Sequence, residues 1–70
     1  MSEIRAEMVA NVIEVHVTEG TAVSPGDTIV LLESMKMEIP VIAETGGIVS
    51  RLAVAVGDVV QEGDVIVELS

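Results

Sequence analysis

The chain is 70 residues long, carries a formal charge of −9 and contains no cysteine, phenylalanine, tryptophan or tyrosine. This length predicts one domain spanning residues 1–70, whose small core leaves no room for a multi-residue catalytic cleft, and a single histidine without cysteine cannot build a metal centre. Because only three side chains are cationic, the surface repels nucleic acid and anionic membranes, and we expect other proteins to be its partners.

The first predicted strand follows from alternation in residues 13–18. Valine and isoleucine dominate the apolar residues of the whole chain, and these β-branched side chains favour strands over helices. A period of two predicts a half-buried strand, with apolar side chains facing inward and polar ones, His16 among them, facing water. The inward set is Ile13, Val15 and Val17, and the outward set is Glu14, His16 and Thr18.

Three further strands are predicted in residues 28–33, 48–54 and 65–69. Turns separate them, at Gly20, Pro25-Gly26-Asp27, Gly46-Gly47, Gly57-Asp58 and Gly63-Asp64. Asp27 and Asp64 are expected to close turns with the glycines before them rather than to bind a metal, because no ligand cluster accompanies either one. Short strands with frequent turns predict an all-β fold, a small sandwich or barrel.

The sequence repeats itself at an offset of 37 residues, which places Gly20 on Gly57 and Gly26 on Gly63. The same shift aligns Val12 with Val49, Val15 with Leu52, Val17 with Val54, Val23 with Val60, Ile29 with Ile66, Val30 with Val67 and Leu32 with Leu69. Neither half could bury its apolar face alone. We therefore expect the halves to pack against each other about a quasi-twofold axis.

Residues 35–47 join the halves and have no counterpart under this shift, and Lys36, the only lysine of the chain, lies among them. If residues 28–34 and 37–41 pair as antiparallel strands, Met35 and Lys36 form a two-residue hairpin turn. Such a turn favours Asn-Gly or Asp-Gly, because its central residues adopt positive φ. Met-Lys at this place indicates that function, not stability, selected these residues.

The run Glu33-Ser34-Met35-Lys36-Met37-Glu38, set in the repeated frame, resembles the biotinyl/lipoyl attachment domain family over about residues 8–70. The resemblance implies a flattened β-barrel or sandwich of two four-stranded sheets with quasi-twofold symmetry, which holds a modified lysine at a hairpin tip. In this family (Ala/Ser)-Met-Lys-Met is typical of biotin, whereas lipoylated members carry an acidic residue before the lysine. Ser34 replaces the commoner alanine, and Asn11 stands near a usual glycine. The chain is most similar to short, free-standing bacterial biotin/lipoyl attachment proteins.

The resemblance implies that Lys36 accepts covalent biotin from biotin protein ligase and carries carboxylate between the active sites of a biotin-dependent carboxylase. The residues that the ligase would recognise are Glu33, Ser34, Met35, Met37 and Glu38. No catalytic residue or metal ligand is expected, because such a chain is a carrier and not an enzyme. Biotin carboxylase and carboxyltransferase subunits are the further implied partners, and we expect the free protein to be a monomer.

Other interpretations of the same residues remain open. Lys36 could carry a lipoyl group, or the domain could be a structural or assembly module without a cofactor. Met35 and Met37 could be core residues, and Lys36 an ordinary solvated charge. Glu33 and Glu38 could suggest a general acid and base, but no partner group accompanies them.

No apolar run approaches the roughly 20 residues that a membrane span requires. The first residues also lack the basic segment and apolar core of an export signal. With no cysteine to form a disulfide, these features lead us to expect a soluble, cytoplasmic protein.

Overall fold

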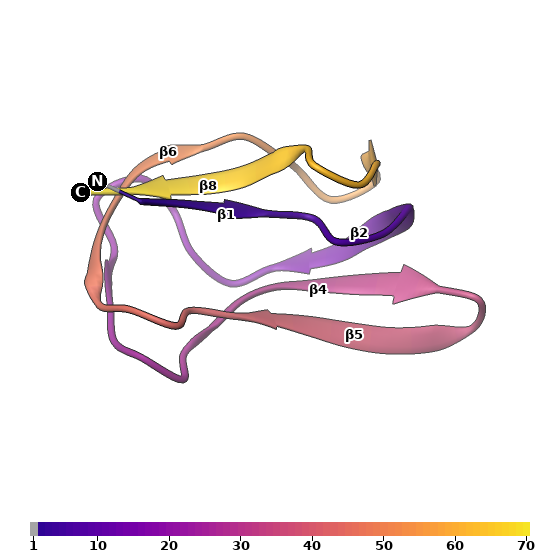
Figure 1. Cartoon of the computed structure of the whole chain (residues 1–70), viewed down its shortest axis with the longest axis horizontal. Helices are drawn as coiled ribbons and strands as arrows, with labels where there is room; N and C mark the ends of the chain where they lie inside the picture. The colour runs from indigo at the N-terminus through magenta and orange to yellow at the C-terminus, as the bar shows by residue number, and fades with distance from the viewer. Residues whose placement is uncertain (1) are drawn as a thin grey trace.

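The computed structural model describes residues 2–70, which form eight short strands joined by tight turns (Figure 1). The strands are β1 (Ser2–Arg5), β2 (Ala10–Val15), β3 (Ala22–Val23), β4 (Thr28–Ser34), β5 (Met37–Ile42), β6 (Gly47–Leu52), β7 (Val59–Val60) and β8 (Val65–Leu69). The three strands predicted in residues 28–33, 48–54 and 65–69 are β4, β6 and β8, although β6 ends at Leu52. Residues 2–70 contain no helix long and apolar enough to cross a membrane.

Two four-stranded antiparallel sheets make up the fold, as predicted, with the strand orders β1-β8-β6-β3 and β5-β4-β2-β7. The 37-residue offset converts one order into the other, since it relates β2 to β6, β3 to β7, β4 to β8, and β1 to β5. The short strands β3 and β7 each pair with a strand of the opposite half. The two halves are therefore interlocked, and neither can complete its sheet alone.

The core between the sheets follows the same symmetry. Ile29 and Ile66 are both fully buried, as are Val30 and Val67. The remaining buried pairs related by the offset are Ala6 with Ala43, Val12 with Val49, Val17 with Val54, Val23 with Val60 and Leu32 with Leu69. The aligned positions of the sequence repeat are thus the positions that bury apolar surface, which confirms that interpretation of the repeat.

The repeat extends further than the aligned sequence positions predict. Residues 39–47 do have counterparts, in residues 2–10, so the prediction that the whole of 35–47 stands outside the repeat is wrong. Ala43 accepts a hydrogen bond from Gly26 N–H and donates one to Asp27 O, and Ala6 makes the equivalent bonds with Gly63 and Asp64. The prediction failed because these segments share backbone geometry more than sequence. Residues 35–38, which include the Met35-Lys36 turn, are what remains without a described counterpart.

The inward face of β2 also differs from the prediction. The β2–β4 register shifts between Val12 and Glu14, which marks a β-bulge at Ile13. As a result Val12 is fully buried, whereas Ile13, predicted to face inward, is only half-buried. The bulge reverses the alternation, so that Val17 is buried farther along the chain and His16 is exposed as predicted.

Four turns of one design connect the strands, and each has a glycine with φ between 91° and 97° at its third position. In the turn of residues 61–64, the Asp64 carboxylate accepts a hydrogen bond of 2.9 Å from the Gln61 N–H. Asp27 accepts the equivalent bond from Ser24, Asp58 from Ala55, and the Thr21 hydroxyl from Thr18. A positive φ at this position is typical of a type II turn and requires glycine. Asp27 and Asp64 therefore close turns, as predicted.

Candidate modification site at the β4–β5 hairpin

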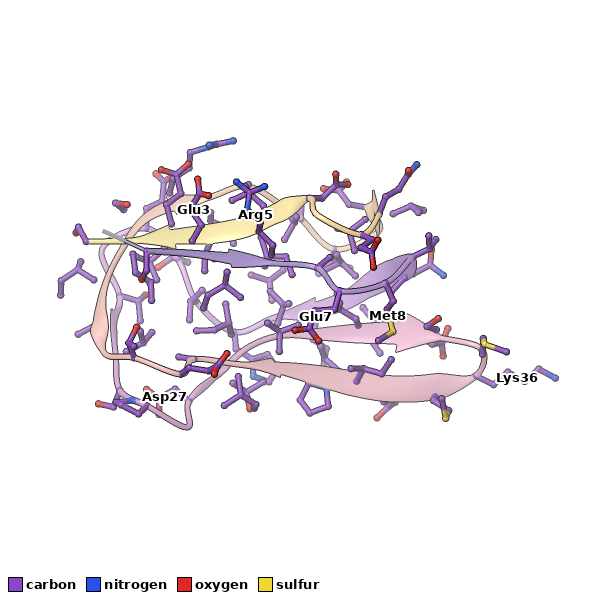
Figure 2. All side chains as sticks on the ribbon, viewed as in Figure 1. Glu3, Arg5, Glu7, Met8, Asp27 and Lys36 are labelled. Atoms are coloured by element: carbon purple, nitrogen blue, oxygen red, sulfur yellow. The ribbon has the colours of Figure 1, made fainter. Side chains whose placement is uncertain are left out.

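The β4–β5 hairpin projects from the end of the molecule opposite the chain termini (Figure 1). Its turn is Met35-Lys36, because Ser34 pairs directly with Met37, as the sequence predicts. The Lys36 side chain is exposed and points away from both sheets (Figure 2). Within residues 2–70 no salt bridge involves it. The only lysine of the sequence is thus a primary amine open to a modifying enzyme.

The turn holds both of its central residues in the left-handed region, with φ of 53° at Met35 and 65° at Lys36. No other non-glycine residue of the described chain has a positive φ. A two-residue hairpin turn needs this geometry for its backbone to match the strand twist, and Asn-Gly would adopt it at lower cost. The backbone is therefore strained at the residues that the motif singles out.

The two methionines beside Lys36 are surface residues. Met35 is 88% exposed and Met37 is 59% exposed, so the alternative in which they fill the core is wrong. Ser34, the small residue of the motif, is half-buried at the end of β4. Long, flexible methionine side chains exposed on both sides of one amine offer an adaptable apolar contact to a protein that binds the tip.

An acidic pair lies behind the tip, because Glu33 of β4 is directly opposite Glu38 of β5. Both side chains are exposed and project from the outer face of the sheet. Like charges in directly opposed positions destabilise a strand pair. No group of His, Cys, Asp or Glu suited to a metal ion occurs among residues 2–70. The pair adds negative charge beside Lys36 but is not part of a metal-binding group.

The neighbouring strands bring further side chains to the same outer face, and sequence reasoning missed their proximity. Asn11 pairs with Glu33 on one side and with Val59 of β7 on the other, so these residues and Glu38 form one row across four strands. All four are exposed. Asn11, which stands near the usual glycine, lies in a regular strand without a positive φ.

Val9 lies two residues before Asn11 and therefore closer to the tip. When the β2–β4 register is continued beyond Asn11, Val9 is level with Met35. Its side chain is 60% exposed, as is that of Val59. Only the pairing of strands reveals this arrangement. The sequence signals were that Val59 aligns with Ala22 and Val9 with Gly46 under the offset, two departures from the repeat.

A groove of about 600 Å³ runs between the edge strands β1 and β5 on another side of the molecule. Glu3, Arg5, Glu7 and Met8 line one wall (Figure 2), and residues 39–42 of β5 form much of the other. Arg5 is bound to Glu3 and to the Gly63 carbonyl, so that its charge is already paired. Lys36 does not line this groove.

Comparison with known proteins agrees with the fold. A family model described as biotin-requiring enzyme matches residues 2–69. A biotinylated protein TB7.3 homolog from Mycobacterium leprae is 59% identical over 68 residues, which make up 97% of this chain and 96% of that protein. A biotin/lipoyl attachment protein from Bacillus subtilis is 45% identical over 67 residues, or 96% of this chain and 92% of that protein.

A solved structure of a single-chain, multi-domain long-chain acyl-CoA carboxylase contains the same fold. It superimposes with a TM-score of 0.88 at 33% identity, over 94% of this chain and 7% of the carboxylase chain. The match is therefore to a small part of a large enzyme, whereas the two relatives above have nearly the length of this chain. With the family model spanning residues 2–69, these findings show that the chain belongs to the biotinyl/lipoyl attachment domain family.

Proposed function

We propose that this protein is a biotin acceptor and carboxyl carrier that receives biotin on Lys36. The observation that supports this most strongly is that the only lysine occupies an exposed, strained hairpin turn outside the repeated scaffold. Membership of the family, with a biotinylated relative of nearly equal length, supports biotin as the attached group. Methionine flanks Lys36 on both sides, and no acidic residue directly precedes it. This pattern favours biotin over lipoate.

The covalent step uses the side chain of Lys36. Its ammonium form loses a proton to a base of biotin protein ligase, and the neutral Nζ attacks the acyl carbon of biotinyl-adenylate. The C–N bond of an amide forms as the C–O bond to AMP breaks; the AMP phosphate leaves with that electron pair, and the nitrogen gives up its second proton to the leaving phosphate or to solvent. Glu33 and Glu38 flank the tip, but no described group lies beside Nζ as a base, so the ligase must supply one.

Once attached, biotin supplies a ureido nitrogen that accepts carboxylate. The remaining role of this chain is positional, because the exposed tip carries the group clear of both sheets (Figure 2). Tethering raises the effective concentration of the group at any site where the domain docks. Biotin carboxylase and carboxyltransferase subunits are the proposed partners, and the cytoplasm, where ATP is available for adenylation, is the proposed location.

Incubation of the purified protein with biotin, ATP and biotin protein ligase tests this function. We expect streptavidin to bind the product, and we expect Lys36→Arg, which keeps the charge and the fold, to abolish that binding. Retention of label by Lys36→Arg would contradict the proposed site. Labelling by lipoate ligase and not by biotin ligase would assign the domain to the lipoyl carriers instead, and no labelling by either enzyme would favour a module without a cofactor.

A further inference from the structure

Two apolar side chains on the outer face of the β5-β4-β2-β7 sheet have no role in the core. Val9 and Val59 are each 60% exposed. Val59 is the cross-strand partner of Asn11 in the row that continues to Glu33 and Glu38, and Val9 lies two residues before Asn11, on the side of the tip. We call Val9, Asn11 and Val59 the outer-face patch. Exposed β-branched residues close to a candidate modification site suggest a contact surface, because burial of their area against a partner is favourable.

The quasi-twofold symmetry provides a comparison within the same molecule. The counterparts of Val9 and Val59 are Gly46 and Ala22, at the other end of the barrel. The scaffold therefore forms the same strands and turns without a valine at either position. The two ends also differ in the opposite direction, because the polar Asn11 at the Lys36 end corresponds to the apolar Ile48 at the other end, and Ile48 is 44% exposed. Even so, the positions of Val9 and Val59 hold valine only at the Lys36 end, against glycine and alanine at the other end.

A modifying enzyme must cover this surface in part. To acylate Lys36 it must enclose the tip, and Val9 lies level with Met35 when the β2–β4 register is continued beyond Asn11 and Glu33. Flexible side chains such as Met35 and Met37 fix the position of an amine poorly. Valine side chains are rigid at χ1 and lose little entropy on binding, so a contact with Val9 and Val59 would orient the hairpin.

We propose that the outer-face patch is a docking surface for biotin protein ligase, which lies across the outer face of the β5-β4-β2-β7 sheet when it modifies Lys36. This inference rests on the proposed function. The charge of the surface fits this occupant, because Glu33 and Glu38 continue the row and favour a partner with basic groups beside its active site. Recognition then requires the folded sheet, since residues 9 and 11 belong to β2 and its flank, residue 33 to β4 and residue 59 to β7.

Steady-state kinetics with a purified bacterial biotin protein ligase, biotin and ATP test the inference, with the carrier as the varied substrate. The double variant Val9→Thr/Val59→Thr removes apolar surface but keeps β-branched residues suited to strands. We expect its KM to rise about tenfold, with kcat within about twofold of the original protein. The matched control is Ile48→Thr, the same kind of change at the opposite end, for which we expect unchanged KM and kcat. Urea unfolding of each variant verifies that it is folded.

Several outcomes would overturn the proposal. They are a KM for the double variant within about twofold of the original, a loss confined to kcat, or an equal rise for Ile48→Thr. A dimer of the original protein that Val9→Thr/Val59→Thr dissociates, measured by light scattering, would assign the patch to a second copy of the chain. If the double variant is labelled normally while Lys36→Arg is not labelled, the docking surface is wrong and the proposed function stands.

Discussion

At the scale of single residues, the hairpin turn carries a backbone cost that no other non-glycine position among residues 2–70 carries. Non-glycine residues in the left-handed region cost roughly 1–3 kcal/mol each, and a directly opposed pair of like charges costs up to about 1 kcal/mol more. Met35 and Lys36 incur the first cost, and Glu33 with Glu38 the second. A domain of this size has a total stability of only about 4–10 kcal/mol. Such costs indicate selection for recognition of the tip.

Replacement of Met35 by asparagine tests this interpretation. Asparagine tolerates positive φ better than methionine, so we expect Met35→Asn to raise the free energy of unfolding by about 0.5–1 kcal/mol, measured by urea denaturation. The same variant should be biotinylated more slowly, because an exposed apolar contact is lost. Met37→Asn is the control, since Met37 lies in a strand without positive φ and should gain no stability. Equal stabilisation by both changes would show that turn strain is not the cause.

At the scale of secondary-structure elements, the strand ends are fixed by the four turns that an Asp or Thr side chain closes with a hydrogen bond. Each turn combines a glycine at positive φ with a side chain that accepts a hydrogen bond from the N–H three residues earlier. Glycine supplies the conformation without steric cost, and the Asp or Thr satisfies a backbone donor that the strands leave free. Because Asp27 and Asp64 occupy equivalent turns, the symmetry predicts equal contributions from them.

Removal of either carboxylate should therefore have the same effect. We expect Asp27→Ala and Asp64→Ala each to lower the free energy of unfolding by about 1 kcal/mol, through loss of the bonds from Ser24 and Gln61. Glu62→Ala serves as the control, because Glu62 lies in the Asp64 turn and makes no such bond. Chemical denaturation of the three variants provides the measurement. The equivalence of the turns would be refuted if Asp64→Ala left the free energy of unfolding unchanged. It would also be refuted if the free energies of unfolding of the two aspartate variants differed by well above about 1 kcal/mol.

At the scale of the whole molecule, the 37-residue offset carried most of the fold prediction, because the aligned valines, isoleucines and leucines are those that fill the core. The β-bulge at Ile13 was not predictable, since alternation in residues 13–18 fits either phase until a partner strand sets the register. The relation of β1 to β5 was missed because backbone pairing, not sequence, makes them equivalent.

The candidate site was predictable only in part, because some of its residues are contiguous in the sequence and others are brought together only by strand pairing. Lys36 and its flanking residues are contiguous, so their hairpin turn follows from local sequence alone. Val9 and Val59 are far from Lys36 in the sequence, and only the strand order β5-β4-β2-β7 brings them to the same face of the sheet. Contiguous motifs are thus accessible before the fold is known, whereas a surface assembled from several strands is not.

Peptide mass mapping of the protein purified from its own cells tests the account most directly. Trypsin cleaves after lysine and arginine, and this chain offers only Arg5, Lys36 and Arg51. Biotin on Lys36 blocks cleavage there, so we expect one peptide spanning residues 6–51, heavier by one biotin less one water. Quantitative recovery of unmodified peptides 6–36 and 37–51, or a mass increase that matches another group or another position, would contradict the account.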